Sequence, residues 1–137
     1  MQKVNSITLN DGWSYFFTDN ARASFNNVDL NALPWIPLPK LSDWMITASV
    51  HFGADWFRRT LVVDAQVMSS ETLLKIDKVP DKVTVFFNGY NVGIAKGRHS
   101  FTADISTILQ TGANELVLKL VCDHCTNGGR FDNVHLQ

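Results

Sequence analysis

The sequence has few of the residues that cross-link a protein or carry it into a membrane. Its 137 residues include two cysteines, Cys122 and Cys125, so no framework of several disulfides can stabilise it. No apolar run approaches the roughly 18 residues of a membrane-spanning helix. The N-terminal residues lack the apolar core of a signal peptide, so a cytoplasmic location is expected. A packed hydrophobic core must therefore supply the stability.

An excess of charge of either sign is also missing. Twelve Lys and Arg residues stand against 13 Asp and Glu residues, which gives a net charge of −1 at pH 7. Binding to nucleic acid or to an anionic membrane depends on basic surfaces, so neither is expected. The length predicts one domain over residues 1–137, since domains run to roughly 100–200 residues. A (β/α)₈ barrel is excluded, because it needs at least about 200 residues.

Residues typical of helices are scarce as well. Glu71 and Glu115 are the only glutamates among the 13 acidic residues, and the aspartates favour turns and caps. Nine Phe, four Trp and many β-branched residues suit pleated, half-buried surfaces. The predicted strands cover residues 7–9, 13–17, 55–63, 72–76, 82–88, 91–94, 101–104, 115–121 and 134–136. This spacing predicts an all-β fold, an antiparallel β-sandwich.

Short motifs indicate how the strands connect. Three prolines in residues 34–39 exclude a central strand and predict an extended edge or crossover segment. Asn88-Gly89 predicts a tight hairpin turn. Asp104 is expected to cap a helical turn over residues 105–109 by accepting a backbone N–H.

Two adjacent arginines occupy the strand over residues 55–63. Arg58 and Arg59 must point to opposite faces, because side chains alternate along a strand. The arginine that lies over the core needs a carboxylate partner, since an unpaired buried charge is costly. Asp104 and Asp64 are the candidates.

Several segments match, in order, the motifs of a known domain. They are Trp35-x-x-Leu38-Pro39, Asp43-Trp44, Gly53–Thr60, Val85–Gly93, Phe101-x-x-Asp104-Ile105-Ser106, Gly112–Leu116 and Gly128–Leu136. Together they resemble the N-terminal sugar-binding domain of family 2 glycoside hydrolases such as β-galactosidases and β-glucuronidases. The resemblance runs from about Leu9 to Leu136. It implies a galactose-binding-domain-like jelly roll, in agreement with the predicted sandwich.

The resemblance also bears on catalysis. In that family the paired catalytic glutamates belong to a separate barrel domain, which this chain does not contain. Retaining hydrolysis needs two carboxyl groups about 5–5.5 Å apart, whereas Glu71 and Glu115 stand at the starts of separate predicted strands. The family's last motif has an Asp that contributes to the neighbouring active site, and here Asn133 takes its place after Asp132. We expect no independent enzymatic activity.

Recognition of a sugar needs aromatic faces and planar polar side chains. The candidates in predicted loops or at strand ends are Trp44, His51, Asp55, Arg98, His99 and Asn133. The resemblance implies that two loops converge at one end of the sandwich, which groups His51, Asp55 and Asn133 with Trp44 as the stacking platform. Arg98 and His99 form a basic hairpin tip that either is simply solvated or binds an acidic sugar or phosphate.

We therefore expect a non-catalytic carbohydrate-binding module. The alternative is a protein-interaction or structural domain that forms a homodimer or partners a separate glycosidase chain. An exposed aromatic ring beside polar groups in a concave region favours the first function. A large, flat apolar patch favours the second.

No cofactor or metal is expected. Cys122-Asp123-His124-Cys125 offers a single Cys-x-x-Cys pair, whereas structural zinc takes four ligands. The two cysteines are expected to be free thiols, with a redox-active pair as the alternative. The fold admits a structural calcium, but no ligand spacing of the EF-hand type supports one.

Overall fold

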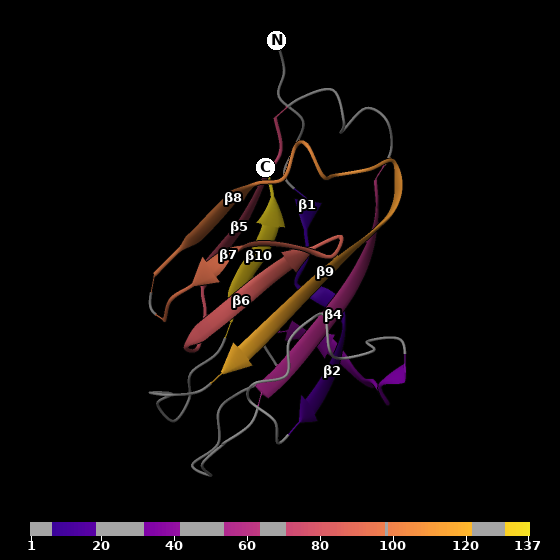
Figure 1. Ribbon diagram of the computed structural model, residues 1–137, viewed down its shortest axis with the longest axis vertical. Helices are drawn as coiled ribbons and strands as arrows, with labels where there is room; N and C mark the ends of the chain where they lie inside the picture. The colour runs from indigo at the N-terminus through magenta and orange to yellow at the C-terminus, as the bar shows by residue number, and fades with distance from the viewer. Residues whose placement is uncertain (1–6, 19–31, 42–53, 64–70, 98, 122–130) are drawn as a thin grey trace.

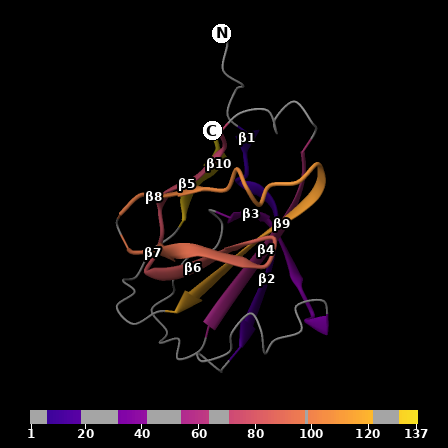
Figure 2. The same cartoon turned by 45° about the horizontal axis from the view of Figure 1, so that its top comes forward.

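The computed structural model describes residues 7–18, 32–41, 54–63, 71–97, 99–121 and 131–137. In this part of the chain there are ten strands and no helix. The strands are β1 (Ile7–Thr8), β2 (Asp11–Thr18), β3 (Ile36–Lys40), β4 (Ala54–Val63), β5 (Leu73–Lys78), β6 (Lys82–Phe87), β7 (Tyr90–Ala95), β8 (Phe101–Asp104), β9 (Gly112–Val121) and β10 (Asp132–Leu136). They form two antiparallel sheets, which confirms the predicted all-β sandwich and is consistent with a jelly roll (Figure 1; Figure 2).

The two sheets differ in size. The smaller has the strand order β1-β10-β5-β8, and the larger has the order β3-β2-β4-β9-β6-β7. β4 and β9 form the longest pairing, in register from Ala54 opposite Val121 to Val63 opposite Gly112. These two strands lie side by side across the centre of the molecule (Figure 1). They provide the rigid platform of the larger sheet.

The larger sheet has two edges of different chemistry. The proline-rich segment forms β3, which pairs with β2 alone and lies at one edge, as predicted. Pro37 and Pro39 have no N–H to donate, so they are tolerated only where that position faces away from the neighbouring strand. β7 forms the opposite edge and pairs with β6 alone among the strands of this sheet. It contains no proline.

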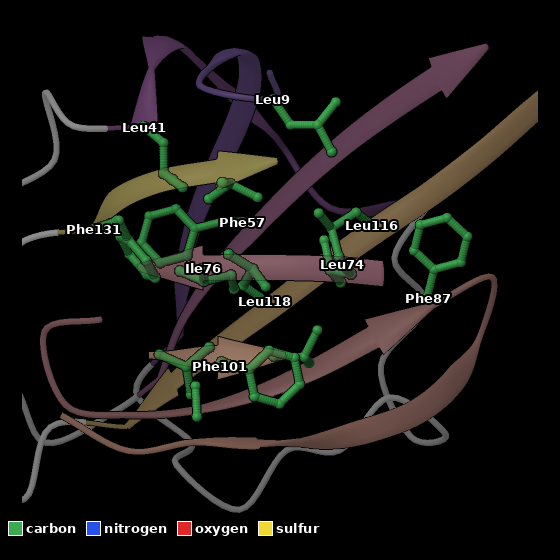
Figure 3. Close-up of a cluster of buried hydrophobic side chains, with 14 of the residues drawn as sticks. Leu9, Leu41, Phe57, Leu74, Ile76, Phe87, Phe101, Leu116, Leu118 and Phe131 are labelled. Atoms are coloured by element: carbon green, nitrogen blue, oxygen red, sulfur yellow. The ribbon is translucent and has the colours of Figure 1, made fainter. Parts of the chain in front are cut away.

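The main core lies between the two sheets. Phe57 of β4 meets Phe131 edge to face, with ring centroids 4.9 Å apart. Leu74 of the smaller sheet and Leu118 of the larger one are fully buried in the same cluster (Figure 3). The Nε1–H of Trp13 donates to the carbonyl of Leu9 at 2.7 Å, so this buried indole has its polar partner.

A second apolar cluster covers the outer face of the larger sheet. Trp56, Phe86 and Val117 come from β4, β6 and β9 and are buried there. Phe16 and Trp35 pack against them, with 6.5 Å between the centroids of these two rings. The start of β4 is therefore buried on both faces. A strand of a two-layer sandwich is expected to be apolar on its inner face only.

Lys119 also lies on this outer face. Its ammonium group stands 5.6 Å from the centre of the Trp56 ring, within the range of a cation–π contact. Burial, followed by the positive charge of Lys82, lowers the pKa of Lys119. The ammonium is therefore partly desolvated by the cluster that it covers.

The predicted turns are present. Asn88 and Gly89 have φ angles of 50° and 84°, as a tight hairpin requires. The Asp104 carboxylate accepts hydrogen bonds from the hydroxyl of Ser106 at 2.6 Å and from its backbone N–H at 2.9 Å. These bonds lower the pKa of Asp104. The helical turn that follows is closed by the N–H of Leu109, which donates to the carbonyl of Ile105 at 2.9 Å.

The prediction for the arginine partners needs correction. Arg59 shares the inner face of β4 with Phe57, and its guanidinium reaches Asp11, 3.3 Å from a carboxylate oxygen. Asp104 does not pair with it; its carboxylate accepts from Ser106 instead. Asp64 lies outside the described residues. The partner of Arg59 is therefore Asp11, an exposed residue at the start of β2, and no buried carboxylate is needed.

Candidate functional site

Three of the six predicted sugar-binding residues can be placed. Trp44, His51 and Arg98 lie outside the described residues, whereas Asp55, His99 and Asn133 are described. Asp55 and His99 lie at the end of the larger sheet where β4 begins and β7 ends, whereas Asn133 on β10 of the smaller sheet bonds with Asn10, just before β2. β5 ends four residues before β6 begins, and its last residue pairs with the start of β10. The start of β6 pairs with the end of β9, which pairs with the start of β4.

Their side chains have different surroundings. Asp55 is 1% exposed on the inner face of β4 and accepts a hydrogen bond from the hydroxyl of Tyr15 at 2.6 Å. Asn133 is exposed, has a φ of 45°, and donates from its side-chain amide to Asp77 at 3.0 Å. His99 is exposed between β7 and β8. Hydrogen bonds to protein groups thus engage Asp55 and Asn133, and their role in sugar binding stays a prediction.

A large depression opens at the other end of the larger sheet. We call it the main depression, with a volume of about 740 Å³. It lies where the middle of β4, the start of β9 and the β6–β7 turn meet the helical turn at residues 105–109. The side chains with polar or aromatic groups that line it include Arg58, Thr60, Tyr90, Thr107, Gln110 and Glu115. It is thus lined by hydroxyl, amide and charged groups and one phenol ring.

A smaller depression of about 300 Å³ adjoins it. This side depression is lined by Gly12, Ser14, Trp35, Arg58 and Thr60, so it shares two residues with the main depression. Tyr90 at one end of the combined surface is 62% exposed, and Trp35 at the other end is half-buried. An aromatic ring is therefore available in each depression.

Arg58 links the two depressions. Its Nε–H donates to the carboxylate of Glu115 at 2.5 Å, and its guanidinium carbon stands 5.8 Å from the centre of the Trp35 ring. Both side chains of the ion pair are about a quarter exposed. A pair this exposed contributes on the order of 1 kcal/mol or less to stability. Its larger effect is to fix the positions of the guanidinium and the indole.

The side-chain amides of Asn88 and Asn114 hold the walls of the main depression together. The side chain of Asn88 accepts from the backbone N–H of Glu115 at 2.8 Å and donates to the carbonyl of Ile108 at 2.9 Å. It also donates to the side chain of Asn114, which in turn bonds the backbone of Gln110 in both directions. The hairpin turn, the helical turn and β9 are therefore tied at one point.

Sequence reasoning did not single out this surface. Tyr90 follows the Asn88-Gly89 turn directly, which places an aromatic ring at a hairpin tip. The position of Tyr90 at a hairpin tip is the one feature of the sequence that indicates this surface. The sequence drew attention to Glu115 only as one of two separated glutamates and to Arg58 only as one of two adjacent arginines. Four separate segments supply the lining, and their meeting depends on the strand order.

The described part of the chain holds neither a metal-binding cluster nor a membrane-spanning helix. No group of three His, Cys, Asp or Glu side chains there could hold a metal ion. Cys122 and Cys125 lie outside it. Among the same residues, no helix has the length and hydropathy needed to cross a bilayer.

Known structures share this architecture over nearly the whole chain. A β-glycosidase from Bacteroides vulgatus aligns with 98% of the chain at a TM-score of 0.78 and 21% identity. A β-glucuronidase from an uncultured Clostridium species aligns with 96% of it at 0.75 and 18% identity. A glycosyl hydrolase family 2 member from Bacteroides cellulosilyticus aligns with 98% of it at 0.71 and 17% identity. What they share with this chain is the fold.

The match covers only a part of those enzymes. The chain spans 20% of the Bacteroides vulgatus and Bacteroides cellulosilyticus chains and 28% of the Clostridium chain. It therefore corresponds to one portion of a much longer polypeptide in each case. No protein-family model and no curated protein sequence matches the chain.

Proposed function

We propose that this chain is a non-catalytic carbohydrate-binding module. The observation that carries the proposal is the exposed ring of Tyr90 in a depression otherwise rich in polar side chains. Sugars present C–H faces that stack on aromatic rings and hydroxyls that bond to polar groups. The fold likeness to portions of a β-glucuronidase and a β-glycosidase supports the same class of ligand.

The proposal assigns no hydrolysis to the chain itself. Glu115 lies on the larger sheet, where its carboxylate accepts from Arg58, and Glu71 stands just before β5 of the smaller sheet. A retaining pair needs one neutral and one ionised carboxyl group about 5–5.5 Å apart. Glu115 is paired with a guanidinium, and the second glutamate precedes a strand of the other layer. Binding without cleavage is the function that this arrangement supports.

A broad glycan screen tests the proposal. The wild-type protein is mixed with neutral and acidic oligosaccharides at millimolar concentration, and tryptophan fluorescence and calorimetry are recorded. We expect saturable binding to at least one class, with no release of reducing ends over the incubation. The Trp44→Ala and His51→Ala variants test the end of the sandwich that the sequence singled out. An absence of binding to every glycan would overturn the proposal.

The open edge of the larger sheet favours a second candidate function, pairing with another protein chain. β7 exposes Tyr90 and Ile94, at 62% and 46%, and has no proline to block strand addition. The other exposed large apolar residues, Ile36 and Val62, are on β3 and β4 and so do not extend this patch. The partner is a second copy or a separate glycosidase chain.

Sedimentation over a range of protein concentrations tests this second candidate. A dimer that dissociates in the Ile94→Lys variant supports pairing through β7. A monomer at all concentrations, with no association with a co-expressed glycosidase, rejects it.

A further inference from the structure

We propose that the carbohydrate ligand is a neutral oligosaccharide that lies across the strands of the larger sheet, over the main and side depressions. This inference deepens the proposed function and rests on it. It places the ligand at the end of the larger sheet away from Asp55 and His99. The argument depends on the shape of the surface, its charge and the rigidity of its walls.

The shape of the surface fits a ligand longer than one sugar ring. The two depressions share Arg58 and Thr60 and so form one continuous surface. It extends from Tyr90 on β7 to Arg58 on β4, and these strands are three positions apart in the sheet. Adjacent strands are about 4.8 Å apart, so the two backbones are separated by about 14 Å. Trp35 extends the surface beyond Arg58.

The charge of the surface fits a neutral ligand. Of the residues that line either depression, Arg58 and Glu115 carry full charges, and these two form an ion pair. A uronate or phosphate would compete with Glu115 for the guanidinium and would face its carboxylate. Among the other lining side chains, Thr60, Thr107 and Gln110 offer hydroxyl and amide groups. Such groups bond sugar hydroxyls without a preference for charge.

The walls of the surface are held in place before any ligand arrives. The bonds of Asn88 and Asn114 tie the turn that carries Tyr90 to β9 and to the helical turn. Arg58 is held by Glu115 on one side and stands near the Trp35 ring on the other. A binding surface that is already ordered avoids the entropic cost of ordering it on binding. This suits a weakly binding ligand such as a neutral sugar.

Calorimetric titration of the whole chain with paired oligosaccharides tests the inference. The probes are neutral gluco-, galacto- and xylo-oligosaccharides and their uronate-containing counterparts. We expect neutral ligands to bind more tightly than their counterparts. Tyr90→Ala should weaken binding at least about tenfold, as truncation of an aromatic anchor does. Val62→Ala is the matched control: its side chain is exposed on β4 and lines neither depression, so affinity should stay within about twofold.

The Glu115→Gln variant tests the charge argument separately. Removing the carboxylate leaves Arg58 without this counter-charge and should raise the relative affinity for uronate-containing ligands about fivefold, as one charge about 4 Å away does in water. Circular dichroism confirms that each variant is folded.

The possible failures are distinguishable. If no saccharide binds the wild-type chain, the inference and the proposed function both fall. If saccharides bind but Tyr90→Ala leaves affinity unchanged while Trp44→Ala abolishes it, the proposed function stands and this location is wrong. If uronates bind the wild-type chain more tightly than neutral ligands, the inferred ligand class is wrong.

Discussion

Replacing Asn114 with alanine should lower the free energy of unfolding by more than the loss of one exposed hydrogen bond would. Asn114 is 2% exposed, and its side chain makes four hydrogen bonds. Its oxygen accepts from the N–H of Gln110 and from the amide of Asn88, both at 2.9 Å. Its amide donates to the carbonyls of Gln110 at 2.7 Å and Gly112 at 3.1 Å.

The size of this loss depends on whether each former hydrogen-bond partner of Asn114 can find another partner in the variant. A hydrogen bond contributes about 0.5–1.5 kcal/mol net, and an unsatisfied buried group costs about 1–3 kcal/mol. Gln110 is exposed and Gly112 half-buried, so water can replace some of the lost bonds. The Asn88 amide keeps its bond to Ile108. We expect a loss of about 2–3 kcal/mol, which lowers Tm by about 10 °C for a chain of this size.

Urea denaturation of Asn114→Ala, followed by circular dichroism, measures this loss. Asn114→Asp is the matched control, because it keeps the size and the acceptor but replaces the donor with an oxygen. At pH 7 it should be less stable than the alanine variant, since a buried carboxylate would face two carbonyls. Burial raises the folded pKa of such a carboxyl, so its cost grows as pH rises through that pKa. A loss below about 0.5 kcal/mol in Asn114→Ala would refute the assigned role.

Three further outcomes follow from other contacts. Ser106→Ala should raise the pKa of Asp104, measured by NMR titration, because the Ser106 hydroxyl is the main group that lowers it. With a folded pKa below the unfolded one, that stabilisation is present above the unfolded pKa and is lost as pH falls through the folded pKa. Gly93→Ala should cost about 1–3 kcal/mol in chemical denaturation, since φ is +142° and a Cβ would lie 3.0 Å from the Phe101 ring. Leu74→Ala, in the fully buried core, should cost about 2–5 kcal/mol in the same assay.

Each of these outcomes has a result that contradicts it. An unchanged Asp104 pKa in Ser106→Ala would show that the Ser106 hydroxyl is not what lowers it. Gly112→Ala is the control for Gly93, because its φ of +94° is strained but its Cβ would meet open space. If both glycine variants lose the same stability, the contact with Phe101 is irrelevant. A loss below about 1 kcal/mol in Leu74→Ala would mean that the core tolerates the cavity.

The strands were predictable because local chemistry determines them. The prolines of residues 34–39 forced an edge position, and Asn88-Gly89 fixed a hairpin by its positive φ angles. The two-sided burial at the start of β4 was not predictable from alternation. Trp56 occupies the outward position of the pattern, and it is buried because residues from β2, β6 and the segment before β3 gather around it. Such contacts depend on strand order, which local pattern does not specify.

The candidate site was less predictable than the fold. Asp55 was singled out by its place at a strand start, but its parity with Phe57 directs it to the inner face, where it is buried. Glu115 and Arg58 are 57 residues apart in sequence and meet only through the pairing of β4 with β9. Tyr90 reaches the same surface from the hairpin of β6 and β7. A composite surface of this kind is visible only after the chain has folded.

The unequal edges of the larger sheet limit what the molecule can assemble into. At β3 the missing N–H groups of Pro37 and Pro39 leave no donors for an added strand. Among the described strands of the larger sheet, growth by strand addition can therefore occur at β7 alone. Two copies joined through β7 would be related by a two-fold axis and would present only proline edges outward. Through this sheet, assembly would stop at a closed pair and could not propagate into a fibre.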